Sequence, residues 1–119
     1  VSFNNTPKVD ILKFGTAVNK AVSDIADLNK KARDIIKNTP DDQIPQAIRQ
    51  LEQVIGDYNT LDSKFLALLR DAKAVEAEIN TTPPQVATIE SQREFLAKIV
   101  KALEDTVAKL KQKLENSTA

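Results

Sequence analysis

The sequence predicts an all-α fold, an up-down-up antiparallel three-helix bundle that forms one domain over residues 1–119. Apolar residues recur at alternating steps of three and four along three long segments, which is the spacing of helices buried along one side. Proline-containing breaks at residues 38–40 and 81–84 separate these segments. Because the connections are short and the helices long, sequential helices are expected to be antiparallel neighbours.

The first expected helix spans residues 7–37. Thr6 and Pro7 stand in the order that helix starts favour, because a threonine side chain accepts a backbone N–H and proline has no N–H to leave unpaired. Gly15 weakens the helix by only about 1 kcal/mol relative to alanine. The apolar stripe consists of Ile11, Phe14, Val18, Ala21, Ile25, Leu28, Ala32 and Ile35.

The second expected helix, residues 45–79, is the one around which the others pack. Pro45 follows Pro40 so closely that we expect a single turn over residues 40–43 and a long helix that begins near Pro45. Its apolar stripe is wide and its charges are mainly acidic, whereas the flanking segments lean basic, so we expect it in the middle of the bundle. The stripe consists of Ile44, Ala47, Leu51, Val54, Tyr58, Leu61, Phe65, Leu68, Ala72, Val75 and Ile79.

The weak point of this second helix is the segment from Gly56 to Thr60. Its glycine, aspartate, asparagine and threonine have low helical propensity, and Thr60 is suited to cap a new helix. The uninterrupted apolar spacing favours one continuous helix. The alternative is a bundle of four helices, with a break between Gly56 and Thr60.

The third expected helix spans residues 83–115, and residues 116–119 are expected to be a frayed tail. Two capping boxes are predicted at the starts of the second and third helices, one from Thr39 and Asp42 and the other from Thr82 and Gln85. The apolar stripe of the third helix consists of Val86, Ile89, Arg93, Leu96, Val100, Leu103, Val107, Leu110 and Leu114, and its one charged member is Arg93.

Composition excludes several classes of function. Seventeen Lys and Arg balance 17 Asp and Glu, which argues against binding to nucleic acid. No apolar run approaches the roughly 20 residues that span a membrane. The chain has no Cys and no His, no glycine-rich phosphate loop and no spacing of metal ligands. We therefore expect a protein that is not an enzyme and that needs no metal or cofactor.

One candidate site lies among aromatic residues. Counting from the turns places Phe14, Phe65 and Phe95 at one level of the bundle, with Ala72 beside them. Such a layer usually fills a core, but a small residue beside large rings can leave a gap that accepts an apolar ligand.

Arg93 is the second candidate, because it lies in an apolar stripe near the predicted aromatic level. It is expected either to fix the helix register by pairing with Asp71 or Asp10, which the same counting places at its level, or to contact the carboxylate of a ligand.

Asn4, Asn80 and Asn116 each begin an N-x-[ST] sequence, the acceptor pattern for N-glycosylation. All three are expected at helix ends or chain ends, where a sugar is tolerated. The chain begins at Val1 rather than Met, which is typical of a processed form or a cloned segment. The three acceptor patterns favour a secreted protein.

Three functional hypotheses follow. The first is a secreted, non-enzymatic binding protein that acts on a protein partner through its helical surface. The second is a small carrier of a fatty acid or other apolar ligand held between the helices. The third is a self-associating coiled-coil module, because heptad spacing is sustained through the chain. The expected oligomeric state is a monomer or a weakly self-associating species.

Overall fold

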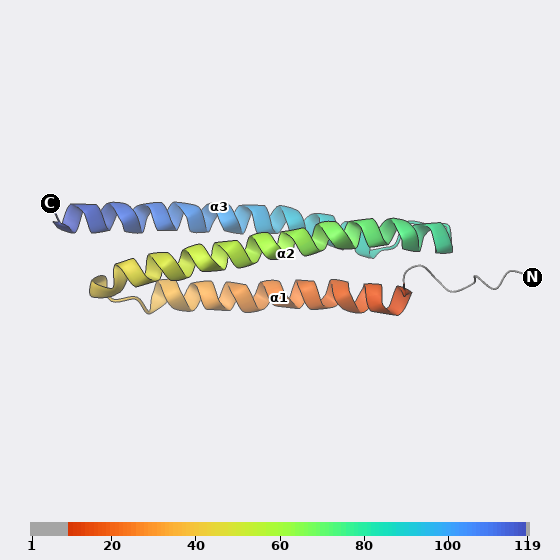
Figure 1. Ribbon diagram of the computed structural model, residues 1–119, viewed down its shortest axis with the longest axis horizontal. Coiled ribbons are helices and arrows are strands. Elements are labelled where there is room, and N and C mark those ends of the chain that lie inside the picture. The colour runs from red at the N-terminus through yellow and green to blue at the C-terminus, as the bar shows by residue number, and fades with distance from the viewer. Residues whose placement is uncertain (1–9, 119) are drawn as a thin grey trace, which may run out of the picture.

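The chain forms three long helices, as the sequence predicts, and α2 lies between α1 and α3 (Figure 1). Sequential helices are antiparallel, so α1 and α3 run in the same direction. The computed structural model describes residues 10–118, which contain α1 (Ile11–Lys37), the short 3-10 helix η1 (Asp41–Gln43), α2 (Ile44–Ile79) and α3 (Gln85–Thr118). The three-helix arrangement confirms the predicted fold class.

The second helix is continuous, so the four-helix alternative is wrong. α2 runs for 36 residues, about 54 Å, straight through Gly56 and Thr60. The hydroxyl of Thr60 donates to the carbonyl of Gly56 at 3.1 Å instead of capping a new helix. Between them Tyr58 is fully buried, and its packing outweighs the small loss of local propensity. The single turn before Pro45 is confirmed as η1.

Three helix boundaries differ from the sequence prediction, and one of them is the start of α3, which lies at Gln85 rather than Pro83. Asp10 caps α1, and its carboxylate accepts the backbone N–H of Lys13 at 3.1 Å. The predicted start at Pro7 with its Thr6 cap lies outside the described residues. At the other end of the chain α3 continues through Thr118, so the prediction of a frayed tail is wrong for residues 116–118.

The two predicted capping boxes do not form. The hydroxyl of Thr39 donates to the carbonyl of Ile35, in the last turns of α1. The hydroxyl of Thr82 donates to the carboxylate of Glu76 at 2.8 Å, near the end of α2. Each threonine therefore bonds to the helix that precedes it: Thr39 supplies a donor to one of the last carbonyls of α1, and Thr82 bonds to an acidic side chain of α2.

The connection between α2 and α3 folds back along α2. Asn80 ends α2 in the left-handed conformation with φ 59°. The bond from Thr82 to Glu76 then holds the connection beside the last turns of α2, and Pro83 is buried there. As a result α3 begins beside α2 rather than beyond its end (Figure 1).

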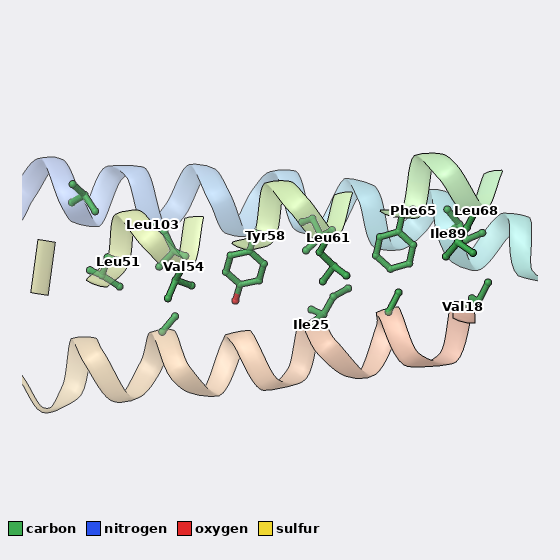
Figure 2. Close-up of a cluster of buried hydrophobic side chains, with 14 of the residues drawn as sticks. Val18, Ile25, Leu51, Val54, Tyr58, Leu61, Phe65, Leu68, Ile89 and Leu103 are labelled. Carbon is green, nitrogen blue, oxygen red and sulfur yellow. The ribbon is translucent and has the colours of Figure 1, made fainter. Parts of the chain in front are cut away.

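The core is built on α2, whose side chains fill the space between α1 and α3. Figure 2 shows Leu61 and Phe65 of α2 directed at α1, with Ile25 of α1 opposite Leu61. Both outer helices pack extensively on α2 and only sparsely on each other. The core residues are Phe14, Val18, Ala21, Ile25, Ala32, Ile44, Ile48, Leu51, Val54, Tyr58, Leu61, Phe65, Leu68, Ala72, Val75, Ile89, Leu96, Leu103 and Val107.

One polar bond crosses this core. The hydroxyl of Tyr58 points at α1 (Figure 2) and donates to Oδ1 of Asn29. Burial raises the pKa of the Tyr58 phenol, because the phenolate would lose its hydration. Within residues 10–118 no buried side-chain nitrogen or oxygen lacks a partner. The bond specifies the register of α1 against α2, since a shifted register would bury a hydroxyl without an acceptor.

Candidate binding surface

The aromatic residues predicted to form one layer are not at one level. Asn29 lies opposite Tyr58, and Phe14 precedes Asn29 by fifteen residues on an antiparallel helix. Phe14 is therefore level with the region of Ala72, about eight residues or about 12 Å from Phe65. All three of these residues are buried, whereas Phe95 lies on the surface with 47% of its area exposed. The structure thus places Ala72 near the level of Phe14 but separates Phe65 and Phe95 from them.

Arg93 pairs with a carboxylate, as predicted, but the partner is Asp62 rather than Asp71 or Asp10. Its Nε and Nη2 atoms donate to the two carboxylate oxygens at 2.9 and 3.2 Å. This bond raises the pKa of the guanidinium. The residue of α2 that lies opposite Arg93 was miscounted because the α2–α3 connection folds back along α2. This path places each residue of α3 beside an earlier residue of α2 than the count predicted. The structural interpretation of Arg93 is supported, since its donors already face a protein acid.

The grooves on either side of α2 are lined by charges. The groove between α1 and α2 contains Asp24, Asp27, Asp57 and Lys64. In the groove between α2 and α3, Lys111 lies 3.5 Å from Glu52, in addition to the Arg93–Asp62 pair. These side chains are partly or largely in solvent, so both grooves present ordinary solvated surfaces.

The surface between α1 and α3 is different in kind. The two helices approach each other at Gly15, where an added Cβ would lie 3.7 Å from Nε2 of Gln85. From that point half-buried residues follow at intervals of seven, which keeps them on one side of each helix. They are Gly15, Val22 and Asn29 on α1, and Gln85, Gln92, Ile99 and Thr106 on α3.

Beside each half-buried row lies an exposed row on the same side of its helix. The exposed rows are Leu12, Asn19 and Ala26 on α1, and Thr88, Phe95 and Ala102 on α3. We call the half-buried and exposed rows together the α1–α3 face. None of its members is charged, although 29% of the chain is charged.

Large apolar side chains are exposed on the α1–α3 face. Phe95 lies near its middle, and Leu12 at one end has 83% of its area exposed. Covering a phenylalanine completely contributes about 1.5–3 kcal/mol, so a considerable part of that stabilisation is not realised at Phe95. The arrangement is suited to non-covalent binding of another apolar surface.

The edges of the α1–α3 face carry more positive than negative charge. At 100° per residue six bases and two acids, Asp34 and Asp105, border the face, whereas the other acids of α1 and α3 fall on other sides of these helices. We call these bases the basic rim: Lys30, Arg33 and Lys37 on α1, and Lys98, Lys109 and Lys113 on α3. Lys113 also reaches Asp41 of η1 at 2.8 Å and lowers the pKa of that carboxyl. The basic rim borders the half of the face that lies toward η1.

The potential sugar acceptors are accessible where they are described. Asn80 is exposed in the α2–α3 connection, and Asn116 is exposed in the last turns of α3. Asn4 lies outside the described residues. Over residues 10–118 there is no group of His, Cys, Asp or Glu that could hold a metal, and none of the helices is long and apolar enough to cross a membrane.

Comparisons with known protein families, curated proteins and solved structures gave no match to this chain. The assignment of function therefore depends on the α1–α3 face itself. Sequence reasoning missed this surface because it placed Phe95 in an aromatic layer with Phe14 and Phe65. A usable signal was present, since α3 carries uncharged residues at Thr88, Gln92, Phe95, Ile99 and Ala102, spaced by three and four.

Proposed function

We propose that this protein is a secreted, non-enzymatic binding protein that contacts a protein partner through the α1–α3 face. The observation that carries the proposal is the exposed ring of Phe95 in the middle of an uncharged surface. Aromatic residues of this kind, surrounded by small and amide side chains, are typical of the centre of a protein interface. The charged grooves on either side of α2 lack that character.

A non-enzymatic role is supported by the side chains that the chain offers. Neither His nor Cys occurs in the sequence, which removes the commonest general base and the most reactive nucleophile. The guanidinium of Arg93 is held by Asp62, and the hydroxyl of Tyr58 is held by Asn29 in the core. These contacts suit structural roles better than roles in a reaction.

Secretion is supported by the acceptor sequences at Asn80 and Asn116, which lie on exposed helix ends. If the protein is secreted by a eukaryotic cell, treatment with an endoglycosidase lowers its mass, and Asn80→Gln lowers the mass of the untreated protein. An unchanged mass in both experiments would remove this support for secretion, although it would leave the binding surface in place.

The carrier hypothesis remains an untested prediction. Phe95 is exposed, so it does not line an aromatic layer between the helices. The guanidinium of Arg93 is bonded to Asp62, so it is not free to contact the carboxylate of a ligand. A titration with a fluorescent fatty acid, together with a melt in the presence of ligand, tests it directly, because a ligand of the native state raises the melting temperature.

A photo-crosslinking experiment tests the proposed function. Phe95 is replaced by p-benzoylphenylalanine, and Leu66 is replaced in the same way in a matched control. Leu66 is a suitable control because it is an exposed apolar residue on α2, outside the α1–α3 face. Both proteins are irradiated in the secreted fraction of the source cells, and crosslinked products are identified by mass spectrometry.

The expected result is one predominant protein partner attached at position 95 and not at position 66. Competition with unlabelled protein should remove the product, and unlabelled Phe95→Gln should compete poorly. The same products at both positions, or none at position 95, would contradict the proposed function.

A further inference from the structure

We propose that the α1–α3 face receives an amphipathic helix of the partner, with an apolar stripe on one side and acidic residues along its flanks. This inference rests on the proposed function and specifies the chemistry of the partner. The observation that supports this inference is an uncharged face between α1 and α3 that has the basic rim along part of its edges.

The shape of the α1–α3 face suits a helix. α1 and α3 run in the same direction on either side of α2 and contact each other sparsely, and within residues 10–118 no further helix covers the side away from α2. The small residues Gly15, Ala26 and Ala102 let a neighbouring backbone approach closely. From Gln85 to Thr106 the face extends for about 32 Å along α3, enough for several turns of a partner helix.

The basic rim determines the charge of the occupant. Its bases include Arg33 and Lys37 on α1 and Lys98 and Lys109 on α3, all exposed, and its six bases outnumber the two acids beside them, Asp34 and Asp105. Acidic flanks on a bound helix would pair with these bases and speed its approach at low salt. The apolar contacts would then centre on Phe95 and Ile99.

The same charges disfavour two other occupants. A parallel second copy placed face to face would bring two basic rims together, and like charges across an interface oppose association, whereas an antiparallel copy would lay each rim against an uncharged half without acids to pair with it. An anionic membrane would match the basic rim, but the face carries the amides of Asn19, Gln85 and Gln92, whereas membrane-binding helices present a broad apolar surface. A helix packed on the face can satisfy the amides and also cover the ring of Phe95.

The test uses two synthetic helical peptides of about 28 residues, or four heptads. Both carry the same leucine and alanine stripe, and their flanking positions are glutamate in one and lysine in the other. Each peptide carries a fluorophore, and binding to the full chain is measured by fluorescence anisotropy at low and at physiological salt. We expect the glutamate peptide to bind at least about tenfold more tightly than the lysine peptide at low salt.

Matched variants locate the binding site. Phe95→Gln should weaken binding of the glutamate peptide by about tenfold, the effect of losing a central aromatic contact, whereas Leu66→Gln should not. The triple variant Lys30→Glu, Arg33→Glu, Lys37→Glu should reverse the preference between the peptides. The control Arg49→Glu, Arg70→Glu, Lys73→Glu changes the net charge equally on exposed positions of α2 and should keep the preference. Circular dichroism confirms that each variant is helical.

Several results would overturn the inference. One is equal affinity for the two peptides, and another is no binding of the glutamate peptide at about 1 mM. A third is an affinity for the glutamate peptide that neither Phe95→Gln nor the rim variant changes. Cosedimentation with phosphatidylcholine–phosphatidylserine vesicles that Phe95→Gln abolishes would identify the face as a membrane surface instead. A dimer in sedimentation equilibrium that Phe95→Gln dissociates would identify a second copy as the occupant.

The crosslinking experiment separates this inference from the proposed function. If position 95 attaches to a partner while the glutamate peptide does not bind, the function stands and the acidic helix is wrong. If the peptide binds as expected and no partner is attached in the secreted fraction, the chemistry of the face stands and the proposed function loses its support.

Discussion

Phe65 and Phe95 are chemically identical, yet they lie in two regions of the molecule that differ in how completely their side chains are buried. Phe65 belongs to the stripe of α2 that fills the space between the outer helices, and it is fully buried. Phe95 lies on the α1–α3 face, which no helix of the described chain covers, and nearly half of its area meets solvent. The difference teaches that α2 supplies most of the packing, whereas the side shared by α1 and α3 is left uncovered within the described residues.

The largest expected effect is the loss of Phe65. Phe65→Ala should lower the free energy of unfolding by about 3–5 kcal/mol, because the truncation leaves a cavity where the core is closely packed. Phe95→Ala should change it by less than about 1 kcal/mol, since its ring is already partly hydrated. Urea denaturation followed by circular dichroism measures both. Equal losses would show that the two regions do not differ as described.

The bond between Tyr58 and Asn29 should have the next largest effect. Tyr58→Phe removes the donor and leaves Oδ1 of Asn29 without it, which should cost about 1–2 kcal/mol. A double-mutant cycle with Asn29→Ala isolates the contribution of the bond, because the two losses add only if the residues are independent. A coupling energy near zero would show that the bond does not hold α1 in register.

The same tyrosine predicts a dependence of stability on pH. Burial raises the pKa of Tyr58 above its ordinary value of 10.0, so the folded protein keeps the phenol protonated where the unfolded chain would ionise. This contribution is fully present below pH 10 and is lost as the pH rises from there through the folded pKa. The difference in unfolding free energy between wild type and Tyr58→Phe should therefore shrink above pH 10. A difference that stays constant up to pH 11 or so would contradict the raised pKa.

The pair between Arg93 and Asp62 should have the smallest effect. About a third of each side chain is exposed, with 35% and 32% of their areas in solvent, so water screens the attraction. Arg93→Leu should change the unfolding free energy by less than about 1 kcal/mol. The difference in unfolding free energy between wild type and Arg93→Leu should become smaller in about 1 M salt. A loss of several kcal/mol, independent of salt, would show that the pair is a structural requirement of the α2–α3 packing.

Much of the fold could be predicted from the sequence because helix formation and burial leave a periodic record. The positions of Leu51, Val54, Tyr58, Leu61 and Phe65 predicted one buried side of α2, and the structure confirms it. The continuity of α2 through Gly56 followed from the same spacing. These features depend on neighbours three or four residues away, so the chain encodes them locally.

The levels between helices could not be counted in the same way, because they depend on the connections. Thr39 and Thr82 have the sequence context of helix starts, yet both hydroxyls bond back to the preceding helix. The backward path of the second connection then places Arg93 against Asp62 instead of Asp71. Local sequence preference does not determine which of two nearby helix ends a hydroxyl will serve.

The sequence by itself determined that this protein has three long helices, that α2 is the central one, and that its side chains include neither His nor Cys. Only the tertiary structure decided which uncharged residues face one another across α1 and α3 and that Phe95 lies outside the core. The physical reason is that helix periodicity specifies the sides of each helix, whereas the register and spacing of two helices that are not sequential neighbours depend on how both pack on the helix between them.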